Sequence, residues 1–466
     1  MSPLRIILSL SLVVAGCAPD TAMPPRRGVA AAKQRDRSAP EAQHVRGAPD
    51  YRSDAAIERL PVPGRAVGWD RERLWSSHVD WEPVVAADPR SDWVYQMASR
   101  YYAPPCEGCP DPIMVFRRSP DGGVSWEDDR YPFTDGDWQN DPQLAVATDG
   151  TVFAAWLQDW RPGVRLSRST DNGVTWSKPV HFTGERQPRW SDHPLLLISD
   201  DGQDVYVAFN NGDSWVAASH DGGLTFGPPV RTNDDARYWF QTGGVVTASG
   251  DVLIAAADYS QDYRGEAHLN VLRSTDGGGS WVSARVDTSA EAPACDWADG
   301  CYFGYLGPRA DLAVDAAGTV MLVYNAGARG DRSQRLWYRT STDALLWSRR
   351  RSLPRPSPRV SFVFPAVVAG PDRGDFRVAW MDDRRAPQSR WNTWSVRTVD
   401  AGATWESRVR LSGGGPETSY SDLEGYAFPY GDYFQLAVDG DGRNHVVWGA
   451  GESYDGSGGV WYTRGR

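Results

Sequence analysis

The chain has 466 residues and a formal net charge of −11, from 49 lysines and arginines against 60 aspartates and glutamates. This acidic balance argues against a nucleic-acid partner, which would require a basic surface. Only 7 histidines are present, and no EF-hand or histidine-rich ligand spacing appears, so we expect neither a metal ion nor another cofactor.

The first residues have the layout of an export signal. Arg5 precedes an apolar run from Ile6 to Val14, which is too short to span a membrane as a mature helix. The run ends in the letters VAGC at 14–17, which resemble a bacterial lipobox. This resemblance implies a signal peptide over residues 1–16, lipidation of Cys17 and an exported lipoprotein anchored to a bacterial membrane. An ordinary signal peptide with a chance cysteine is the alternative.

Residues 17–60 are rich in alanine, proline, arginine and aspartate and show no apolar periodicity. Such a segment cannot bury enough apolar surface to fold, so we expect a flexible tether after the lipidated end. No second apolar stretch reaches the length needed to span a membrane. We therefore expect residues 61–466 to form one globular domain.

One turn motif with the outline SxDxGxxW recurs along this domain. Its copies read SPDGGVSW (119–126), STDNGVTW (169–176), SHDGGLTF (219–226), STDGGGSW (274–281) and TVDAGATW (398–405), with a worn sixth copy STDALLW (341–347). Each lies between two short β-type runs, as at a hairpin. The aspartate can accept hydrogen bonds from backbone N–H groups ahead of it, and the glycine supplies a positive φ. The final aromatic ring can pack against a neighbouring sheet, so we predict a structural role for these turns.

A second repeat lies between the turns, in which a short apolar strand, a tight turn and another strand follow one another. It occupies residues 84–97, 144–157, 195–209, 245–257, 312–324, 367–380 and 436–448. These seven units predict seven blades, with the two strands of each unit innermost. The last unit ends after its third strand, and the segment RLWSSHV (73–79) could supply the missing outer strand and close the ring.

The repeated turns resemble the Asp boxes of sialidase-type β-propellers. This resemblance implies an all-β fold, a single propeller of four-stranded antiparallel blades. Sialidases have six blades, whereas the units counted here favour seven; six remains the alternative if one unit is an inserted hairpin. The resemblance also implies an active site on the face opposite the turns, where we expect the longest loops, including the segment from Asp382 to Trp394.

Four cysteines follow Cys17, and an even count in an exported chain favours disulfides. Their spacing favours the local pairs Cys106–Cys109 and Cys295–Cys301, although four cysteines permit three pairings. A zinc site is the alternative. The second pair argues against it, because it does not have the CxxC spacing.

Polar side chains recur at the entrance to the first strand of each unit. The positions around the ring are Glu82, Asp141, Asp192, Gln241, Arg309, Phe364 and Tyr433. Converging on one mouth, they would make a better pocket than any one of them makes a catalyst. The structural alternative for each carboxylate is that it caps a loop.

The loops that leave the second strands are a further source of polar groups. They carry Asp159, Asp213, Asp258, Asp262, Arg264, Glu266, Asp383, Arg384, Arg385, Glu452 and Asp455. A substrate carboxylate is held best by bidentate guanidinium groups, so Arg309, Arg384 and Arg385 are the candidates for that role. Glu82, Asp258 and Asp383 are the acidic candidates for substrate binding.

The resemblance to sialidases implies a tyrosine nucleophile activated by a glutamate, near the entrance to a late inner strand. Tyr433 in GDYFQLAVDGDG lies in a similar position, whereas Tyr420 has the letters YSDL but lies too far upstream. For the acid/base role Asp141 and Asp192 are available. The glutamate beside the tyrosine could be one of Glu266, Glu424 and Glu452; we take Glu452 as the candidate.

Two functional hypotheses follow from these residues. A third, a structural or assembly factor on the cell envelope, is supported by no particular residue. The first is a sialidase-like glycoside hydrolase that acts on extracellular glycans as a monomer. The alternative is a propeller that binds a glycan or a protein without turnover. The stretch DWEPVVAAD, with Glu82 where sialidases carry an arginine, favours this alternative. Exposed indoles would favour the same alternative, since indoles stack on sugars. The candidates are Trp160, Trp239, Trp391 and Trp394.

Overall fold

The computed structural model describes residues 67–76, 78–159, 163–181, 191–295, 298, 301–328, 333–386, 390–415 and 417–466. All of them belong to the second of two compact units, Pro40–Arg466. The predicted leader, Cys17 and the tether lie outside the described residues. Within the described ranges, no helix has the length and apolar character needed to cross a membrane.

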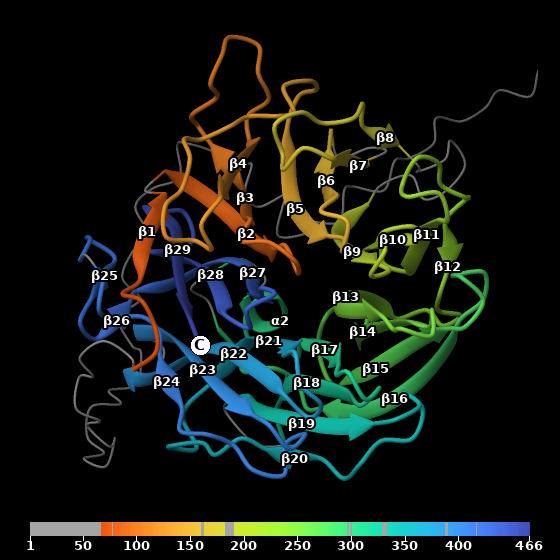
Figure 1. Cartoon of the computed structure of the whole chain (residues 1–466). Helices are drawn as coiled ribbons and strands as arrows, with labels where there is room; N and C mark the ends of the chain where they lie inside the picture. The colour runs from red at the N-terminus through yellow and green to blue at the C-terminus, as the bar shows by residue number, and fades with distance from the viewer. Residues whose placement is uncertain are drawn as a thin grey trace, which may run out of the picture. The chain divides into compact units, whose positions relative to one another are not determined.

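The strands form seven antiparallel sheets that follow one another around a ring (Figure 1). We number these sheets as blades in chain order. Blade 1 holds β2 (Val79–Ala87), β3 (Val94–Tyr101) and β4 (Ile113–Ser119); blade 2 holds β5 (Gln139–Val146), β6 (Val152–Gln158), β7 (Gly163–Ser169) and β8 (Val180–His181); blade 3 holds β9 (Asp192–Ile198), β10 (Val205–Asn210), β11 (Ser214–Ser219) and β12 (Val230–Arg231); blade 4 holds β13 (Tyr238–Val246), β14 (Val252–Tyr259), β15 (Ala267–Ser274) and β16 (Val282–Ser289).

The second half of the ring continues in the same way. Blade 5 holds β17 (Ala310–Val314), β18 (Val320–Ala326), β19 (Arg335–Ser341) and β20 (Arg351–Ser352); blade 6 holds β21 (Phe362–Ala369), β22 (Phe376–Ala386), β23 (Arg390–Thr398) and β24 (Val409–Arg410), with β25 (Ser421–Asp422) and β26 (Gly425–Tyr426) added; blade 7 holds β27 (Phe428–Val438), β28 (Asn444–Gly451) and β29 (Gly458–Gly465), with β1 (Arg73–Ser76) outermost. The only α-helix of the described ranges is the short α2 (Cys301–Gly304). Seven blades, rather than six, are thereby confirmed.

The ring closes where the sequence predicts. Strand β1 pairs antiparallel with β29, with Arg73 opposite Tyr462 and Leu74 opposite Trp461. The N-terminal segment is also fastened to blade 6, because the Glu72 carboxylate accepts a hydrogen bond of 2.7 Å from the Gly414 N–H. The first described residues thus complete the last blade, as expected for a closed propeller.

Two blades depart from the four-stranded pattern. In blade 1, the place of a fourth strand is taken by an isolated bridge between Phe116 and Arg130. In blade 6, β22 continues to Ala386 and β23 begins at Arg390, so the two strands have 11 and 9 residues. The expectation of a long loop from Asp382 to Trp394 is therefore wrong, because most of that segment is paired strand.

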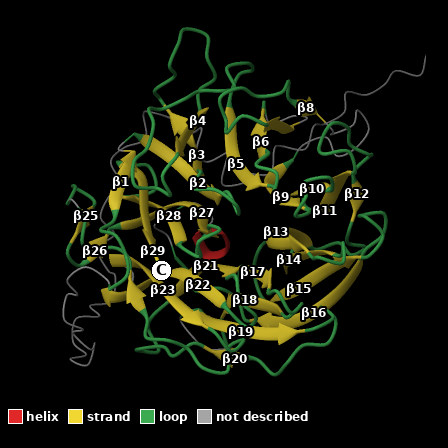
Figure 2. Cartoon of the chain, in the orientation of Figure 1, coloured by secondary structure: helices red, strands yellow, loops and turns green. Residues whose placement is uncertain are grey.

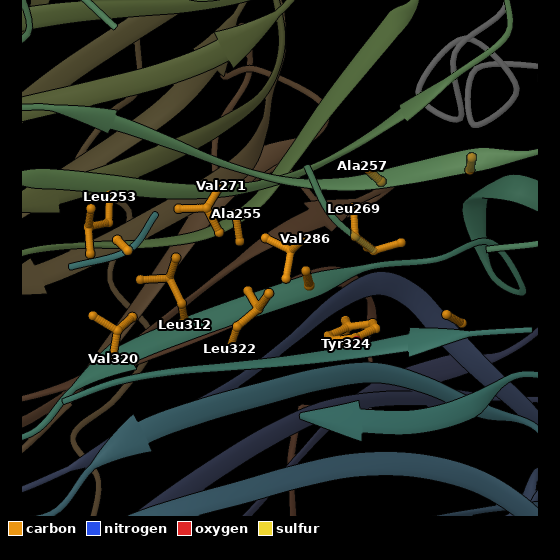
Figure 3. Packing of buried hydrophobic residues seen from close by; sticks show 14 of the residues in the cluster. Leu253, Ala255, Ala257, Leu269, Val271, Val286, Leu312, Val320, Leu322 and Tyr324 are labelled. Carbon is orange, nitrogen blue, oxygen red and sulfur yellow. The ribbon is translucent and has the colours of Figure 1, made fainter. Parts of the chain in front are cut away.

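The core lies between successive blades. Figure 3 shows Leu253 and Val271 of blade 4 facing Leu312 and Leu322 of blade 5, all four buried. Apolar side chains on both faces of each inner strand are needed for this packing, which explains the nearly continuous apolar runs. Three of the four indoles that could have stacked on a sugar if exposed are part of the core as well: Trp239 is 4% exposed, Trp391 3% and Trp394 4%, while Trp160 lies outside the described residues.

The repeated turns hold themselves together by hydrogen bonds. In the second copy, the Asp171 carboxylate accepts bonds from the Thr175 N–H at 2.9 Å and the Thr175 hydroxyl at 2.6 Å. The Ser169 hydroxyl accepts a bond from the Gly173 N–H at 2.8 Å. The two bonds from Thr175, with one of 2.8 Å that the Ser169 hydroxyl donates to the same carboxylate, lower the pKa of Asp171 to about 2. The glycine has a φ of 75°, as predicted from its place in the motif.

Each final aromatic of a turn packs against the preceding blade. Trp176 of blade 2 meets Phe116 of blade 1 edge to face, with ring centroids 5.4 Å apart. Trp405 of blade 6 meets Tyr338 of blade 5 in the same way at 5.1 Å. The worn sixth copy is one residue shorter, and Ala344, with a φ of 57°, takes the place of the glycine. The turns therefore join neighbouring blades, in agreement with a structural role.

Candidate functional site

A cavity of about 340 Å³ runs along the axis of the ring. The first strand of every blade contributes to its wall, with Val84, Gln143, Leu195, Gly243, Asp311, Ala366 and Gln435 as one residue from each. Because the hairpins between first and second strands share a face with the repeated turns, the first strands begin on the opposite face. The lining runs from residues near the beginning of these strands, such as Arg309 and Tyr433, to residues at their ends, such as Val314 and Ala369.

Four predicted or neighbouring polar side chains line the cavity near the beginning of these strands. They are His193, Thr242, Arg309 and Tyr433. The His193 ring stacks on Tyr433 with centroids 4.6 Å apart. The Arg309 guanidinium lies over Phe240 at 5.1 Å and over Phe364 at 5.0 Å, so it is held between two aromatic rings.

The helix α2 lies at the centre of the ring, where Figure 2 shows it end-on. The Arg309 Nη2 donates a hydrogen bond of 2.8 Å to the Gly304 carbonyl oxygen at the end of this helix. The next residue, Tyr305, is fully buried against Phe364 and Phe428. The Arg309 guanidinium, which lines the cavity, is therefore already hydrogen-bonded to the Gly304 carbonyl oxygen.

Both predicted disulfides are present. Cys106 is bonded to Cys109, and Cys295 is bonded to Cys301. The second bond joins the start of α2 to the loop before it, so it ties the segment that covers Arg309. Of the three pairings that the sequence allowed, the local one is confirmed.

A backbone irregularity marks the entrance to four first strands. Glu82, Asp141, His193 and Phe364 have φ values between 48° and 57°, and a proline follows each of them. Because proline has no N–H, the ladder is interrupted and the register shifts at this point. In blade 3 the residue equivalent to Asp141 is therefore His193, not Asp192 as the sequence analysis expects. The His-Pro pair, aligned with Glu-Pro and Asp-Pro, is the signal that could have found it.

The acidic groups at these entrances bind the backbone of the next blade. The Glu82 carboxylate accepts bonds from the Asp141 N–H at 3.1 Å and from the Ser99 hydroxyl at 2.9 Å. The Asp141 carboxylate accepts a longer bond of 3.4 Å from the His193 N–H. Asp192 is 8% exposed, and its carboxylate lies 3.0 Å from the same N–H. These acids thus join blades 1, 2 and 3.

Further along the ring, other side chains serve the same purpose. The Thr242 hydroxyl donates to the Ala310 carbonyl at 2.6 Å, which joins blade 4 to blade 5. The Asp311 carboxylate accepts the Val367 N–H at 2.8 Å, which joins blade 5 to blade 6. A ring of such bonds explains why polar residues recur at this level of the channel.

Asp311 is a polar residue of the cavity that the sequence analysis missed. Although it faces the cavity, protein surrounds it, and this burial raises its pKa to about 7. Gly243 of blade 4 makes room for it, since a Cβ there would lie 2.0 Å from the carboxylate. The signal was an aspartate in the otherwise apolar run ADLAV.

The arginines expected to bind a substrate carboxylate have separate environments. Arg384 is buried, its Nε donates to Asp382 at 2.8 Å, and its guanidinium stacks on Trp394 at 3.8 Å. Arg385 forms an ion pair of 3.1 Å with Glu424. Neither lines the axial cavity, so Arg309 is the only one of the three that does.

The remaining predicted acids lie in three different places. Asp258 is buried within blade 4, where it accepts the Asn270 amide at 2.7 Å and pairs with Arg237. Asp383 is buried and accepts the Ser361 N–H at 2.8 Å. Glu452 is exposed in the hairpin after β28. Among the described residues, no group of three or more His, Cys, Asp or Glu side chains is placed to hold a metal ion.

Comparison with known proteins agrees with this fold. A sialidase from Bacteroides fragilis is 23% identical over 310 residues, which cover 63% of this chain and 48% of that protein. The chain thus spans about half the length of the curated relative it matches. No family model matches the sequence.

Solved structures that resemble the chain include several sialidases. A Hadza microbial sialidase shares 16% identity at a TM-score of 0.47, covering 76% of this chain and 73% of its own. A protein of unknown function from Dyadobacter fermentans shares 12% at 0.47, covering 86% and 99%. An intramolecular trans-sialidase from Ruminococcus gnavus shares 14% at 0.45, covering 83% and 94%. Sequence and architecture together describe a seven-bladed β-propeller that is similar to sialidases.

Proposed function

We propose that this protein is a sialidase-like glycoside hydrolase that acts on extracellular glycans at the axial cavity. The observation that carries the proposal is that Tyr433 and Arg309 line one cavity, near the beginning of the first strands of their blades. The sequence similarity to a sialidase supports the same chemistry. Fold alone would not support it, since propellers serve many functions.

In this proposal the residues take the following roles. Tyr433 is the nucleophile, because a neutral phenol suits an anomeric carbon that bears a carboxylate. Arg309 holds that carboxylate by a charge-assisted hydrogen bond, in place of the Gly304 carbonyl. Asp141, Asp192 and Glu452 are the candidates for proton transfer, and of these Glu452 is exposed.

Binding without turnover is the second candidate, and a specific observation favours it. Arg384 and Arg385 are each neutralised by an acid of their own blade or its added hairpin, Asp382 and Glu424. Glu82 and Asp141 hold the backbone of the next blade. A site that keeps one arginine and no dedicated acid could retain a glycan without cleaving it.

The location proposed for the protein follows from its first residues. We propose that residues 1–16 are removed and that Cys17 is lipidated, which would anchor the propeller to a bacterial membrane through residues 17–60. Mass spectrometry of the mature N-terminus tests this, and an unmodified Cys17 or an uncleaved leader would refute it.

The catalytic proposal is tested by incubating the purified full chain with aryl sialosides and a broad panel of glycans. We expect release of a terminal sugar, and a loss of at least about a hundredfold in rate for Tyr433→Phe, since the reacting oxygen is removed. Tyr420→Phe is the matched control, because Tyr420 is equally buried but does not line the cavity. Retention of a glycan without cleavage would favour the second candidate, and neither cleavage nor retention would refute both.

A further inference from the structure

Two side chains from distant blades meet in the axial cavity. The His193 ring, at the entrance of β9 in blade 3, stacks on the Tyr433 ring of β27 in blade 7, with centroids 4.6 Å apart and planes at 23°. Blades 1 and 2 separate them on one side of the ring and blades 4 to 6 on the other, so they meet across the axis. Both line the cavity, and they are only 6% and 7% exposed. The proposed nucleophile is therefore in direct contact with a titratable ring.

The backbone of His193 is held in place independently of this contact. Its N–H lies 3.0 Å from the Asp192 carboxylate and 3.4 Å from the Asp141 carboxylate of blade 2. At the equivalent position of blade 2, the Asp141 side chain thus binds the backbone of the next blade. The His193 side chain differs, because its ring contacts the Tyr433 ring and, at 4.4 Å, the Phe240 ring. Blade 3 therefore places an imidazole in the cavity where blade 2 places an acid.

The charged groups around His193 come from its own blade and from two others. The Asp192 and Asp141 carboxylates, at its backbone N–H, attract a positive charge on the imidazole. The Arg309 guanidinium of blade 5 contacts the same Phe240 ring at 5.1 Å and opposes that charge. Arg309 is itself bonded to the Gly304 carbonyl oxygen. The surroundings thus offer two acids and one cation to the imidazole.

We propose that His193 is a positioning residue for Tyr433: its stacked ring fixes the phenol, and its protonated form stabilises the negative charge that the phenol oxygen gains as it attacks. The inference rests on the proposed function, in which Tyr433 is the nucleophile. A cation beside an aromatic ring is attracted to it, and a developing phenoxide strengthens the attraction. The sialidase resemblance implies a glutamate beside the tyrosine, but among the described residues that line the cavity there is no glutamate.

The step balances without a further reactant. The Tyr433 O–H bond breaks, its proton passes to one of the acids proposed for proton transfer, and the phenol oxygen bonds to the anomeric carbon. The glycosidic bond breaks at the same time, and its electron pair goes to the leaving oxygen, which takes up a proton. His193 keeps its own proton throughout, so it acts through Tyr433 and is not the base. Because histidine loses its charge between pH 5 and pH 8, the contribution of His193 should be lost as pH rises through this range.

The test is the pH profile of kcat from pH 5 to pH 8, with an aryl sialoside, for the purified full chain and for His193→Phe. Phenylalanine keeps a ring against Tyr433 without a charge. We expect the kcat of the unaltered chain to exceed that of His193→Phe at least about tenfold at pH 5 and to lie within about twofold of it at pH 8. Asp311, with a pKa of about 7, titrates in the same range, but it is common to both proteins and cancels in the ratio.

His220→Phe is the matched control, because the His220 side chain is 56% exposed on a repeated turn and does not line the cavity. Its pH profile should match that of the unaltered chain. Thermal unfolding of each variant shows whether a loss of rate is only a loss of fold. A ratio between the unaltered chain and a folded His193→Phe that stays constant from pH 5 to pH 8 would overturn the inference and leave the hydrolase intact.

A second measurement does not depend on cleavage. In carbon-13 NMR of the full chain with labelled histidines, the His193 signal is identified by its loss in His193→Phe. We expect it to titrate between pH 5 and pH 8 and to shift in Tyr433→Leu, because the neighbouring phenol ring is lost. These shifts without cleavage of any sialoside would refute the hydrolase alone. A His193 signal that does not change with pH would overturn the inference even if the chain cleaves.

Discussion

At the scale of single residues, the partner of each polar side chain decides what that residue can do. Glu82 and Asp141 occupy the entrance positions that the sequence predicts. Their partners, however, are backbone N–H groups 59 and 52 residues further along the chain. Such partners belong to the next blade, so no local pattern reveals them. The sequence could therefore predict polar positions at the mouth, but not which of them join blades.

Asp311 provides a test of this joining role through pH. Its pKa is about 7 in the folded chain, above the 3.8 of an ordinary aspartate, because burial of the carboxyl group disfavours its charged form. Between pH 4 and 7 the folded chain therefore holds a proton that the unfolded chain releases, so the free energy of unfolding falls as pH rises through this window. Asp311→Asn removes that dependence. We expect the difference in the free energy of unfolding between the variant and the unaltered chain to rise by roughly 1–3 kcal/mol from pH 5 to pH 8, in favour of the variant. This follows from about 1.4 kcal/mol per pKa unit.

Urea denaturation at the two pH values measures this difference. Asp171→Asn is the control, because Asp171 lies on an outer turn and its pKa of about 2 places its titration below the range compared. A difference between Asp311→Asn and the unaltered chain that stays constant from pH 5 to pH 8 would contradict the account of Asp311.

At the scale of elements, local sequence predicts the turns well and the strand entrances poorly. The aspartate, glycine and aromatic ring of each repeated turn interact within the turn or with the nearest blade, so the motif contains most of the information. At the entrance of β9 the predicted position is wrong by one residue, Asp192 instead of His193. The reason is a backbone bulge at His193, which the proline after it causes. The β22–β23 hairpin was expected as a loop, since its polar letters do not show that its backbone is paired.

The glycine of a repeated turn is needed both for its conformation and for the space it leaves. In Gly173→Ala, the added Cβ would lie 2.6 Å from Phe116 at a φ of 75°. We expect the free energy of unfolding to fall by roughly 2–4 kcal/mol, from backbone strain and overpacking together. Gly250→Ala separates the two causes, because Gly250 has a φ of 86° and nothing within 4 Å of the added Cβ.

Gly250→Ala should lower the free energy of unfolding by only about 1 kcal/mol, because backbone strain is its only cost. Chemical denaturation of both variants provides the comparison. If the two substitutions cost the same, the contact between the turn and the preceding blade would not contribute to stability as described.

At the scale of the whole molecule, the sequence predicts the ring, its seven blades and the strand that closes it. These follow from repeats that can be counted and from a last unit that lacks one strand. The segment that lies over Arg309 cannot be predicted in the same way. The helix α2 and Tyr305 come from a loop without any repeat, and their position over Arg309 depends on the Cys295–Cys301 bond and on three blades at once.

The central claim is that the axial cavity is the site where a glycan's terminal sugar binds. A crystal structure of the full chain with N-acetylneuraminate tests it most directly. We predict the sugar in the cavity, its carboxylate on Arg309 in place of the Gly304 carbonyl oxygen, and its ring beside Tyr433. A sugar bound elsewhere, with the hydrogen bond from Arg309 to Gly304 intact, would contradict the account.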